Sequence, residues 1–177
     1  INTLNPDTST KFGKVYKYYE KYKAEHNQLD FDDMLVKCYE ILSTNEKGLR
    51  YCQEQYQFIL ADEMQDTNAV QYEIIKLIGA RYKNVFVVDD PLQNIFMWRG
   101  SDNKFVMNFD EDWPNTKIIH LNKNYRSSQD IVAAANHFAK CIPESSHRHY
   151  VESIADRDFN ATEMKLLQQY GVEDRVV

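Results

Sequence analysis

Apolar residues recur every three or four positions in the first part of the chain, as they do on one face of an α-helix. This spacing predicts a helix over residues 11–27, a second helix that begins after Asp30, and a third, short helix over residues 46–55. Asp30 suits the position before a helix, because its carboxylate can accept hydrogen bonds from free amides of the first turn. The beginning of the chain should therefore be helical.

The pattern changes after residue 57, where short and continuous apolar runs replace the helical spacing. Three such runs, over residues 58–61, 85–88 and 117–121, are rich in branched side chains. Runs of this kind are typical of strands in a parallel sheet that is buried on both faces. Helical spacing returns over residues 69–81 and 127–140. The alternation of strand and helix predicts an open α/β sheet.

Composition and charge narrow the class of protein without indicating a function. The 177 residues contain 21 Lys and Arg against 27 Asp and Glu, a formal charge of −6, which argues against a protein that coats nucleic acid through bulk charge. No apolar run is long enough for a membrane helix, and the three cysteines are too far apart for a zinc site or a disulfide framework. We therefore expect a cytoplasmic protein without a membrane partner.

Five lysines lie along the first predicted helix: Lys11, Lys14, Lys17, Lys21 and Lys23. The simpler interpretation is a solvent-exposed helix face, and the alternative is a local patch that faces the phosphates of a nucleic acid. The sequence favours the first interpretation and leaves the second open.

A pair of carboxylates, Asp62 and Glu63, directly follows the first predicted strand. Ligands of α/β sheets gather at the carboxyl ends of strands, where nucleotide hydrolases hold Mg²⁺ through one or two carboxylates. One carboxylate could hold the metal while the next orients or deprotonates an attacking water. The pair alone is weak support, because acidic residues at strand ends often only cap the following helix.

Four segments, in order along the chain, give the carboxylate pair a context. They resemble motifs of the UvrD/Rep/PcrA family of superfamily 1 DNA helicases. The pair lies in a stretch similar to the Walker B segment, and the others are similar to an upstream Leu-Asp-Phe-Asp-Asp stretch, to motif III and to motif IV. In chain order the segments are residues 29–35, 62–68, 87–100 and 121–127. The resemblance extends over residues 12–138 and implies an ATP-dependent motor acting on DNA.

The resemblance implies a role for each matching residue of the nucleotide site. Asp62 would bind Mg²⁺, and Glu63 would be the catalytic carboxylate. Gln65 and Asp66 would connect the nucleotide site to its surroundings, and Gln93 matches the motif III glutamine that senses the γ-phosphate. ATP and Mg²⁺ are thus the implied cofactors.

The resemblance also implies a DNA-binding loop and a second phosphate contact. Phe96 and Trp98 match aromatic residues on which bases of single-stranded DNA stack, and Arg99 would bind DNA beside them. Arg126 matches the motif IV arginine that reaches the γ-phosphate from the second motor domain. Simpler interpretations remain open: the two rings could belong to the core, Arg99 could pair with Asp102, and Arg126 could merely begin a helix.

The chain also departs from the family pattern. Asp89 stands where motif III usually has glycine, and Asn94 and Phe96 stand where serine and tyrosine are usual. More important, the sequence contains no Gly-x-x-x-x-Gly-Lys-[Ser/Thr] loop, so the amides and the lysine that cradle the β- and γ-phosphates are missing. We expect this chain by itself not to hydrolyse ATP.

These features predict a three-layer α/β fold from a RecA-like P-loop motor, with a parallel sheet but without the Walker A unit. Residues 1–112 would form the later part of a first RecA-like domain. Residues 113–177 would form the beginning of a second such domain, with motif IV, and an unassigned tail. The acidic stretch 110–115 is the expected linker, and residues 163–169 could form a helix. The chain would then be an internal piece of a longer helicase.

The predicted function is that of a part of an ATP-dependent DNA helicase. The resemblance implies 3′-to-5′ translocation on single-stranded DNA, unwinding of duplex, and a role in DNA repair or replication. The partners would be single-stranded and duplex DNA and the rest of the parent chain. The rival prediction is a non-catalytic module that binds single-stranded DNA or a protein, because the phosphate loop is absent.

Overall fold

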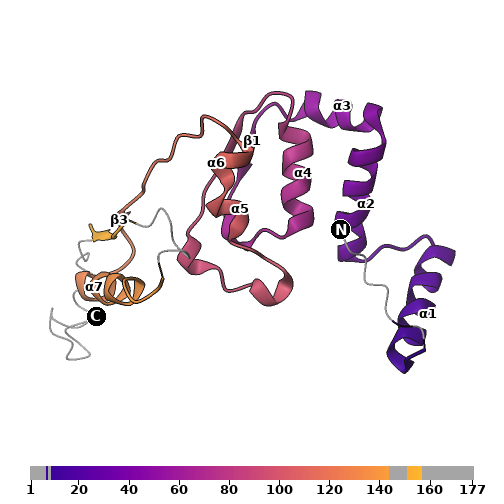
Figure 1. Ribbon diagram of the computed structural model, residues 1–177, viewed down its shortest axis with the longest axis horizontal. Coiled ribbons are helices and arrows are strands. Elements are labelled where there is room, and N and C mark those ends of the chain that lie inside the picture. The colour runs from indigo at the N-terminus through magenta and orange to yellow at the C-terminus, as the bar shows by residue number, and fades with distance from the viewer. Residues whose placement is uncertain (1–6, 8, 144–150, 157–177) are drawn as a thin grey trace, which may run out of the picture. The chain divides into compact units, whose positions relative to one another are not determined.

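The computed structural model describes residues 7, 9–143 and 151–156, whose helices and strands are drawn in Figure 1. The chain divides into two compact units. The first unit contains Ile1–Asp89 and Ile95–Phe105, and the second contains Asp90–Asn94 and Val106–Val177. The helix predicted over residues 163–169 lies outside the described residues. The domain boundary predicted at residue 112 stays a prediction.

Four helices of the first unit follow the predicted pattern closely. They are α1 (Lys11–Glu25), α2 (Phe31–Thr44), α3 (Glu46–Gln55) and α4 (Ala69–Gly79). Asp30 caps α2 as expected: its Oδ1 accepts a hydrogen bond from the Asp33 amide over 2.9 Å, and Asp33 Oδ2 accepts one from the Asp30 amide over 3.0 Å. Reciprocal bonds of this kind satisfy two amides that the helix leaves unpaired, and they fix where α2 begins.

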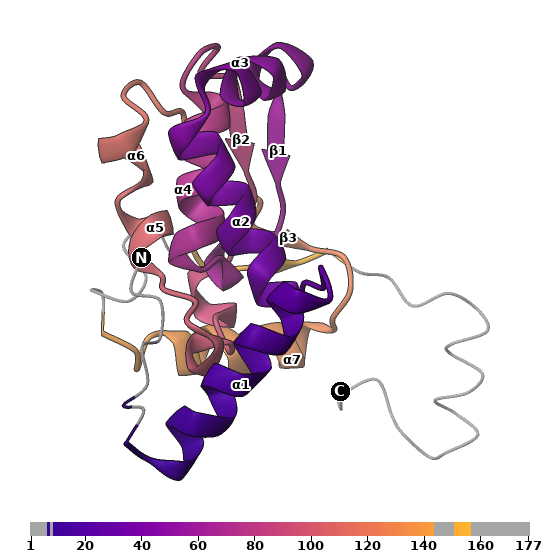
Figure 2. The ribbon, with the colours of Figure 1, turned by 90° about the vertical axis from the view of Figure 1, so that its right-hand side faces the viewer.

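Two short strands form the sheet of the first unit. Strand β1 (Ile59–Ala61) pairs in parallel with β2 (Val85–Val87), with Ile59 opposite Val85. Helix α4 is the crossover between them, and it packs against α2 and α3 (Figures 1 and 2). Buried Leu42 and Tyr72, from α2 and α4, belong to the core of this unit.

The strands are not buried on both faces, contrary to the prediction. Leu60 is 75% exposed and Phe86 is 56% exposed, whereas Ile59 and Val87 on the other face are half-buried. Alternate residues of a strand point to opposite faces of a sheet. The outward residues Leu60 and Phe86 are therefore exposed on one face of the β1–β2 pair. The helices and the parallel strands agree with an α/β fold, and the three-layer RecA-like arrangement stays a prediction.

The prediction of a third strand over residues 117–121 is also wrong. These residues belong to no strand, and Ile118, Ile119 and Leu121 are exposed, because no strand within the described residues pairs with them. The pairing starts slightly later, where β3 (Lys123–Asn124) pairs in parallel with β4 (Ile154–Ala155). An apolar run of this length does not by itself distinguish a paired strand from extended chain.

The predicted linker is partly helical. Helix α6 (Phe109–Asp112) covers the first part of the acidic stretch. Phe109 is buried, and its ring lies tilted by 30° against the Trp113 ring, with 6.1 Å between the ring centroids. The turn comes later, at Asn115, whose φ is 73°. Short helix α5 (Lys104–Met107) precedes it.

Helix α7 (Gln129–Ala139) carries the core of the second unit through buried Val132 and Ala139. Its Asn136 side chain donates to the Ser153 carbonyl over 2.8 Å and accepts from the Ser153 amide over 3.1 Å, which holds the chain before β4 against the helix. No helix in the described part of the chain is long and apolar enough to cross a membrane.

Candidate nucleotide and DNA sites

The chain turns sharply where β1 ends, at Asp62 and Glu63. Glu63 has φ 52° and ψ 44°, in the left-handed region, and its amide donates to Asp62 Oδ1 over 3.0 Å. A residue with a Cβ pays about 1–2 kcal/mol for this conformation. Strained backbone of this kind gathers at functional sites. Both carboxylates are exposed at the carboxyl end of the strand, where α/β proteins bind ligands.

Gln65 holds the Glu63 carboxylate. It lies in the 3₁₀ turn η1 (Met64–Asp66), and its Nε2 donates to Glu63 Oε2 over 2.6 Å. Gln65 is only 1% exposed, so the amide is fixed by its surroundings. The Met64 amide continues the β1–β2 pairing by donating to the Val88 carbonyl over 3.0 Å. The turn that presents Glu63 is thus anchored to the sheet.

Asp66 has one buried carboxylate oxygen, Oδ1, without a hydrogen-bond partner in the part of the chain that the structure describes. Such atoms are uncommon in native proteins and are usually satisfied by water, an ion or another group. Asp66 is therefore placed to accept a donor that the described residues do not supply, and its linking role stays a prediction.

Asp62 fits a magnesium site. Its carboxylate is exposed and supplies the hard oxygen ligand that Mg²⁺ prefers, with room for the waters that this ion retains. Mg²⁺ in nucleotide sites uses one or two carboxylates and substrate phosphates. A dense cluster of carboxylates around Asp62 is therefore not required.

A cluster of three carboxylates does lie elsewhere in the first unit, and Lys23 occupies it. Lys23 is only 7% exposed, and its Nζ lies 2.8 Å from Glu20 Oε1, 2.8 Å from Asp30 Oδ2 and 2.7 Å from Asp33 Oδ2. Neither interpretation of the lysine-rich helix holds for Lys23, which joins α1 to α2. The acidic residues Glu20, Asp30 and Asp33, close to Lys23 in the sequence, were the signal that could have predicted this cluster.

The cluster shifts the acid–base behaviour of its members. Burial opposes the charge of Lys23, but hydrogen bonds to Asp30, Asp33 and Glu20 raise its pKa well above the usual value. The hydrogen bond from Lys23, and then that from the Asp33 amide, lower the pKa of Asp30 well below its usual range. Lys23 and Asp30 therefore both carry their charges throughout the neutral pH range.

Gln93 belongs to the second unit, in the 3₁₀ turn η2 (Pro91–Gln93). Its exposed side chain donates through Nε2 to Asp90 Oδ2 over 2.7 Å, and Asp90 Oδ1 accepts from the Leu92 amide over 3.0 Å. Asp90 is a positioning residue that sequence reasoning missed, although its place just before a proline turn was a usable signal.

The predicted stacking residues lie around the 3₁₀ turn η3 (Met97–Arg99). The rings of Phe96 and Trp98 are 6.4 Å apart at 54°, and the Arg99 guanidinium lies 5.8 Å and 5.4 Å from their centroids. Trp98 is 78% exposed, so its assignment to the core is wrong. Phe96 is half-buried. The turn thus presents an open indole with a cation beside it.

Asp102 pairs with Lys104 instead of with Arg99, contrary to the simpler interpretation of Arg99. Its carboxylate pairs with Lys104 over 2.7 Å, and the hydrogen bond from Lys104 lowers the pKa of Asp102. The chain around it returns to the Walker B segment: Ser101 forms a β-bridge with Asn68, and the Asp102 amide donates to the Thr67 carbonyl over 3.4 Å. Sequence patterns gave no signal of this contact.

Arg126 lies between β3 and α7, with an exposed side chain. Asn124 shapes its backbone, because Asn124 Oδ1 accepts hydrogen bonds from the amides of Arg126 and Ser127 over 2.9 Å and 2.8 Å. Asparagine two residues before a turn is a common signal for this arrangement. Arg126 and Gln93 both lie in the second unit, whereas the carboxylates of the Walker B segment lie in the first.

Comparison with known proteins decides the family. Residues 2–114 match the UvrD/REP helicase N-terminal domain. The chain belongs to the UvrD/REP helicase family. The ATP-dependent DNA helicase PcrA of Staphylococcus epidermidis is 40% identical over 156 residues, which are 81% of this chain and 21% of that protein. The putative ATP-dependent DNA helicase YjcD of Bacillus subtilis is 41% identical over 123 residues, 70% of this chain and 16% of YjcD.

The match confirms the family that the four motifs indicated. The chain spans about a fifth of the length of the PcrA relatives, including one from Staphylococcus aureus that is 35% identical over 156 residues. Within this UvrD/REP family chain, the structure brings Asp62, Glu63 and Gln65 together at one strand end and gathers the aromatic residues at another turn. The chemical roles of these residues remain predictions.

Proposed function

We propose that this chain forms part of an ATP-dependent DNA helicase and supplies its catalytic carboxylate, its magnesium ligand and a loop that stacks on single-stranded DNA. The observation that carries the proposal is the strained Glu63 at the end of β1, held by a buried glutamine at 2.6 Å. A strained, exposed carboxylate fixed by a buried partner is suited to chemistry rather than to packing.

The chain's residues would divide the work of hydrolysis. Asp62 would hold Mg²⁺ directly or through water, and the bound ion would neutralise charge on the phosphates of ATP. Glu63 would orient the attacking water and accept its proton, and Gln65 would keep the carboxylate in position. Gln93 would hydrogen-bond the γ-phosphate through its neutral amide, and Arg126 would reach the same phosphate.

The exposed Trp98 ring, with Phe96 and Arg99 beside it, would contact single-stranded DNA. Flat rings stack on any base, so they suit movement along DNA of any sequence. The residues after this loop pair with the Walker B segment, because Ser101 forms a β-bridge with Asn68 and the Asp102 amide donates to the Thr67 carbonyl. These contacts would connect the DNA-binding loop to the segment that carries the two carboxylates. By family membership, the whole protein would be a cytoplasmic 3′-to-5′ helicase of DNA repair or replication that also unwinds duplex.

Glu63→Gln in a helicase that contains this chain tests the proposal. The amide keeps the shape of the side chain but cannot accept the proton, so DNA-stimulated turnover should fall about 10²–10⁴-fold while ATP binding is retained. Glu111→Gln, which neutralises an exposed carboxylate elsewhere, should keep wild-type turnover. A Glu63→Gln rate within a few-fold of wild type would show that Glu63 is not the catalytic carboxylate.

The absent phosphate loop favours a second candidate, a non-catalytic binding module. Without that loop, the chain by itself should release phosphate from ATP no faster than background, with or without single-stranded DNA. Steady-state phosphate release measures this. DNA-stimulated turnover by the isolated chain, lost in Glu63→Gln, would contradict the expectation and remove the second candidate.

A further inference from the structure

One side of α1 presents a stripe of lysines that the nucleotide site and the stacking loop do not use. Lys11, Lys14, Lys17 and Lys21 follow one another at three- and four-residue steps, which places them on one face of the helix. All four are exposed. Lys21 forms a weak surface pair with Glu25 over 3.5 Å, and the described residues give the other three no ion pair.

Aromatic side chains border this stripe. Tyr18 lies one turn after Lys14 and is 71% exposed, and Tyr22 lies one turn after Tyr18 and is also exposed. The Tyr22 ring stacks on His26 with 4.0 Å between centroids, so a flat surface already forms there. Exposed rings of this size beside unpaired cations indicate a ligand that is both flat and negatively charged.

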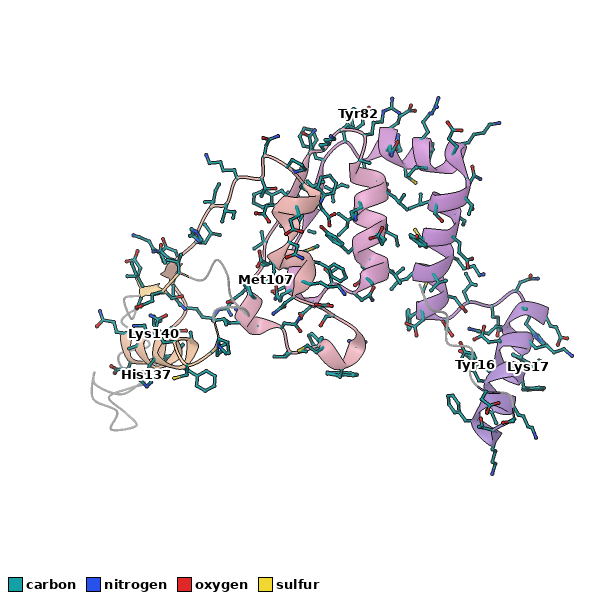
Figure 3. All side chains as sticks on the ribbon, viewed as in Figure 1. Tyr16, Lys17, Tyr82, Met107, His137 and Lys140 are labelled. Atoms are coloured by element: carbon teal, nitrogen blue, oxygen red, sulfur yellow. The ribbon has the colours of Figure 1, made fainter. Side chains whose placement is uncertain are left out.

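The opposite side of α1 is fixed against α2, which sets the direction of the stripe. The Tyr19 hydroxyl donates to Asp30 Oδ2 over 2.9 Å, and Lys23 binds the three carboxylates described above. In Figure 3, Tyr16 and Lys17 project from different sides of the helix. The lysine stripe therefore faces away from the contacts that hold α1.

We propose that this face of α1, defined by Lys11, Lys14, Lys17, Lys21, Tyr18 and Tyr22, is a second contact surface for single-stranded DNA. The lysines would neutralise successive phosphates, and the tyrosines would stack on bases. This inference rests on the proposed function.

Charge distribution favours DNA as the occupant. Four exposed lysines lie on the proposed face of α1, apart from the buried Lys23 with its three carboxylate partners, whereas the whole chain has a net charge of −6. Attraction of a polyanion is therefore local to α1. The stripe runs for about 15 Å along the helix, long enough for two or three phosphates of an extended strand. An acidic protein surface would match the lysines, but it would give the exposed rings no bases to stack on.

The experiment measures binding of a fluorescein-labelled oligothymidylate to the full 177-residue chain by anisotropy over a range of salt concentrations. Each lost phosphate contact lowers the slope of log K against log salt by about 0.7 for single strands. Lys14→Ala/Lys17→Ala should lower the slope by about 1.4 and weaken binding at low salt roughly 10-fold. Lys47→Ala/Lys117→Ala, which removes two exposed lysines outside α1, should keep the wild-type slope.

A second readout locates the DNA. An oligonucleotide that contains bromodeoxyuridine should crosslink to Tyr18 or Tyr22 under ultraviolet light, and mass spectrometry of the peptides identifies the residue. A wild-type slope in the lysine variant, crosslinks confined to the Trp98 loop, or no binding by the wild-type chain would each overturn the α1 surface. Crosslinks confined to the Trp98 loop would leave the proposed function intact, and the catalytic role of Glu63 is decided separately by the turnover of Glu63→Gln.

Discussion

Gly48 and Gly100 differ in backbone conformation, because Gly48 is helical and Gly100 is left-handed. Gly100 has φ 86°, and a Cβ built there would contact nothing within 4 Å, so only the backbone conformation requires glycine. Gly48 lies within α3, and a Cβ there would make ordinary contacts of 3.5 Å and 3.6 Å with Asn45 and Ile41. The two sites should therefore respond to alanine with opposite signs.

Gly100→Ala should lower the free energy of unfolding by about 1–2 kcal/mol, the cost of a left-handed backbone with a Cβ. Gly48→Ala should raise it by about 0.5–1 kcal/mol, because alanine loses less backbone entropy in a helix. Urea unfolding followed by circular dichroism measures both. A stabilising Gly100→Ala would mean that the turn after Trp98 does not hold this conformation.

At the scale of elements, the junction of α1 and α2 depends on ionised carboxylates. Since the folded pKa of Asp30 is depressed, its contribution to stability is present above its unfolded pKa and is lost as pH falls towards the folded pKa. The unfolded value is about 3.9, so the loss begins near pH 5 and continues well below 4. Acid should therefore release α1 from α2.

Asp30→Asn isolates this effect, because asparagine caps helices as well as aspartate but carries no charge. Unfolding midpoints should fall less steeply between neutral pH and about pH 3 in Asp30→Asn than in wild type. Asp32→Asn, on the exposed side of the same helix turn, is the matched control and should keep the wild-type pH dependence. Equal slopes for all three proteins would remove the Lys23 cluster as the source of acid sensitivity.

Local features of helices and turns could be predicted from the sequence, whereas features that depend on distant contacts could not. Helix α3 has the predicted bounds, because its pattern and caps are local. The run 117–121 was mistaken for a strand, since pairing depends on a distant segment that periodicity does not reveal. For the site, the strand end at Asp62 was predictable from the motif. The left-handed turn at Glu63, the burial of Lys23 and the Asn68–Ser101 bridge depend on tertiary contacts.

At the scale of the whole molecule, the proposed chemistry joins residues of two units. Asp62 and Glu63 belong to the first and Arg126 to the second. An arginine that meets the γ-phosphate only when a cleft closes would couple hydrolysis to domain motion. Planar, forked guanidinium suits that contact better than a lysine ammonium.

In a helicase that contains this chain, Arg126→Ala should lower DNA-stimulated ATPase by about 10³-fold or more and leave affinity for single-stranded DNA largely unchanged. Arg126→Lys should restore little of the rate. Arg50→Ala, at an exposed arginine of α3, is the control. Near-normal turnover in Arg126→Ala, or full recovery with lysine, would leave Arg126 as a surface residue before α7.

The open face of the β1–β2 pair has a practical consequence for the isolated chain. Its outward residues Leu60 and Phe86 are exposed apolar side chains. Within the described part of the chain, β1 and β2 pair only with each other, which leaves the outer edge of each strand without a partner strand. Exposed strand edges can pair with strands of other molecules, and exposed apolar patches promote association. Concentrated preparations of the isolated chain should therefore aggregate through this face of the sheet. A charged side chain in place of Leu60 should oppose this association and keep the protein monomeric during purification.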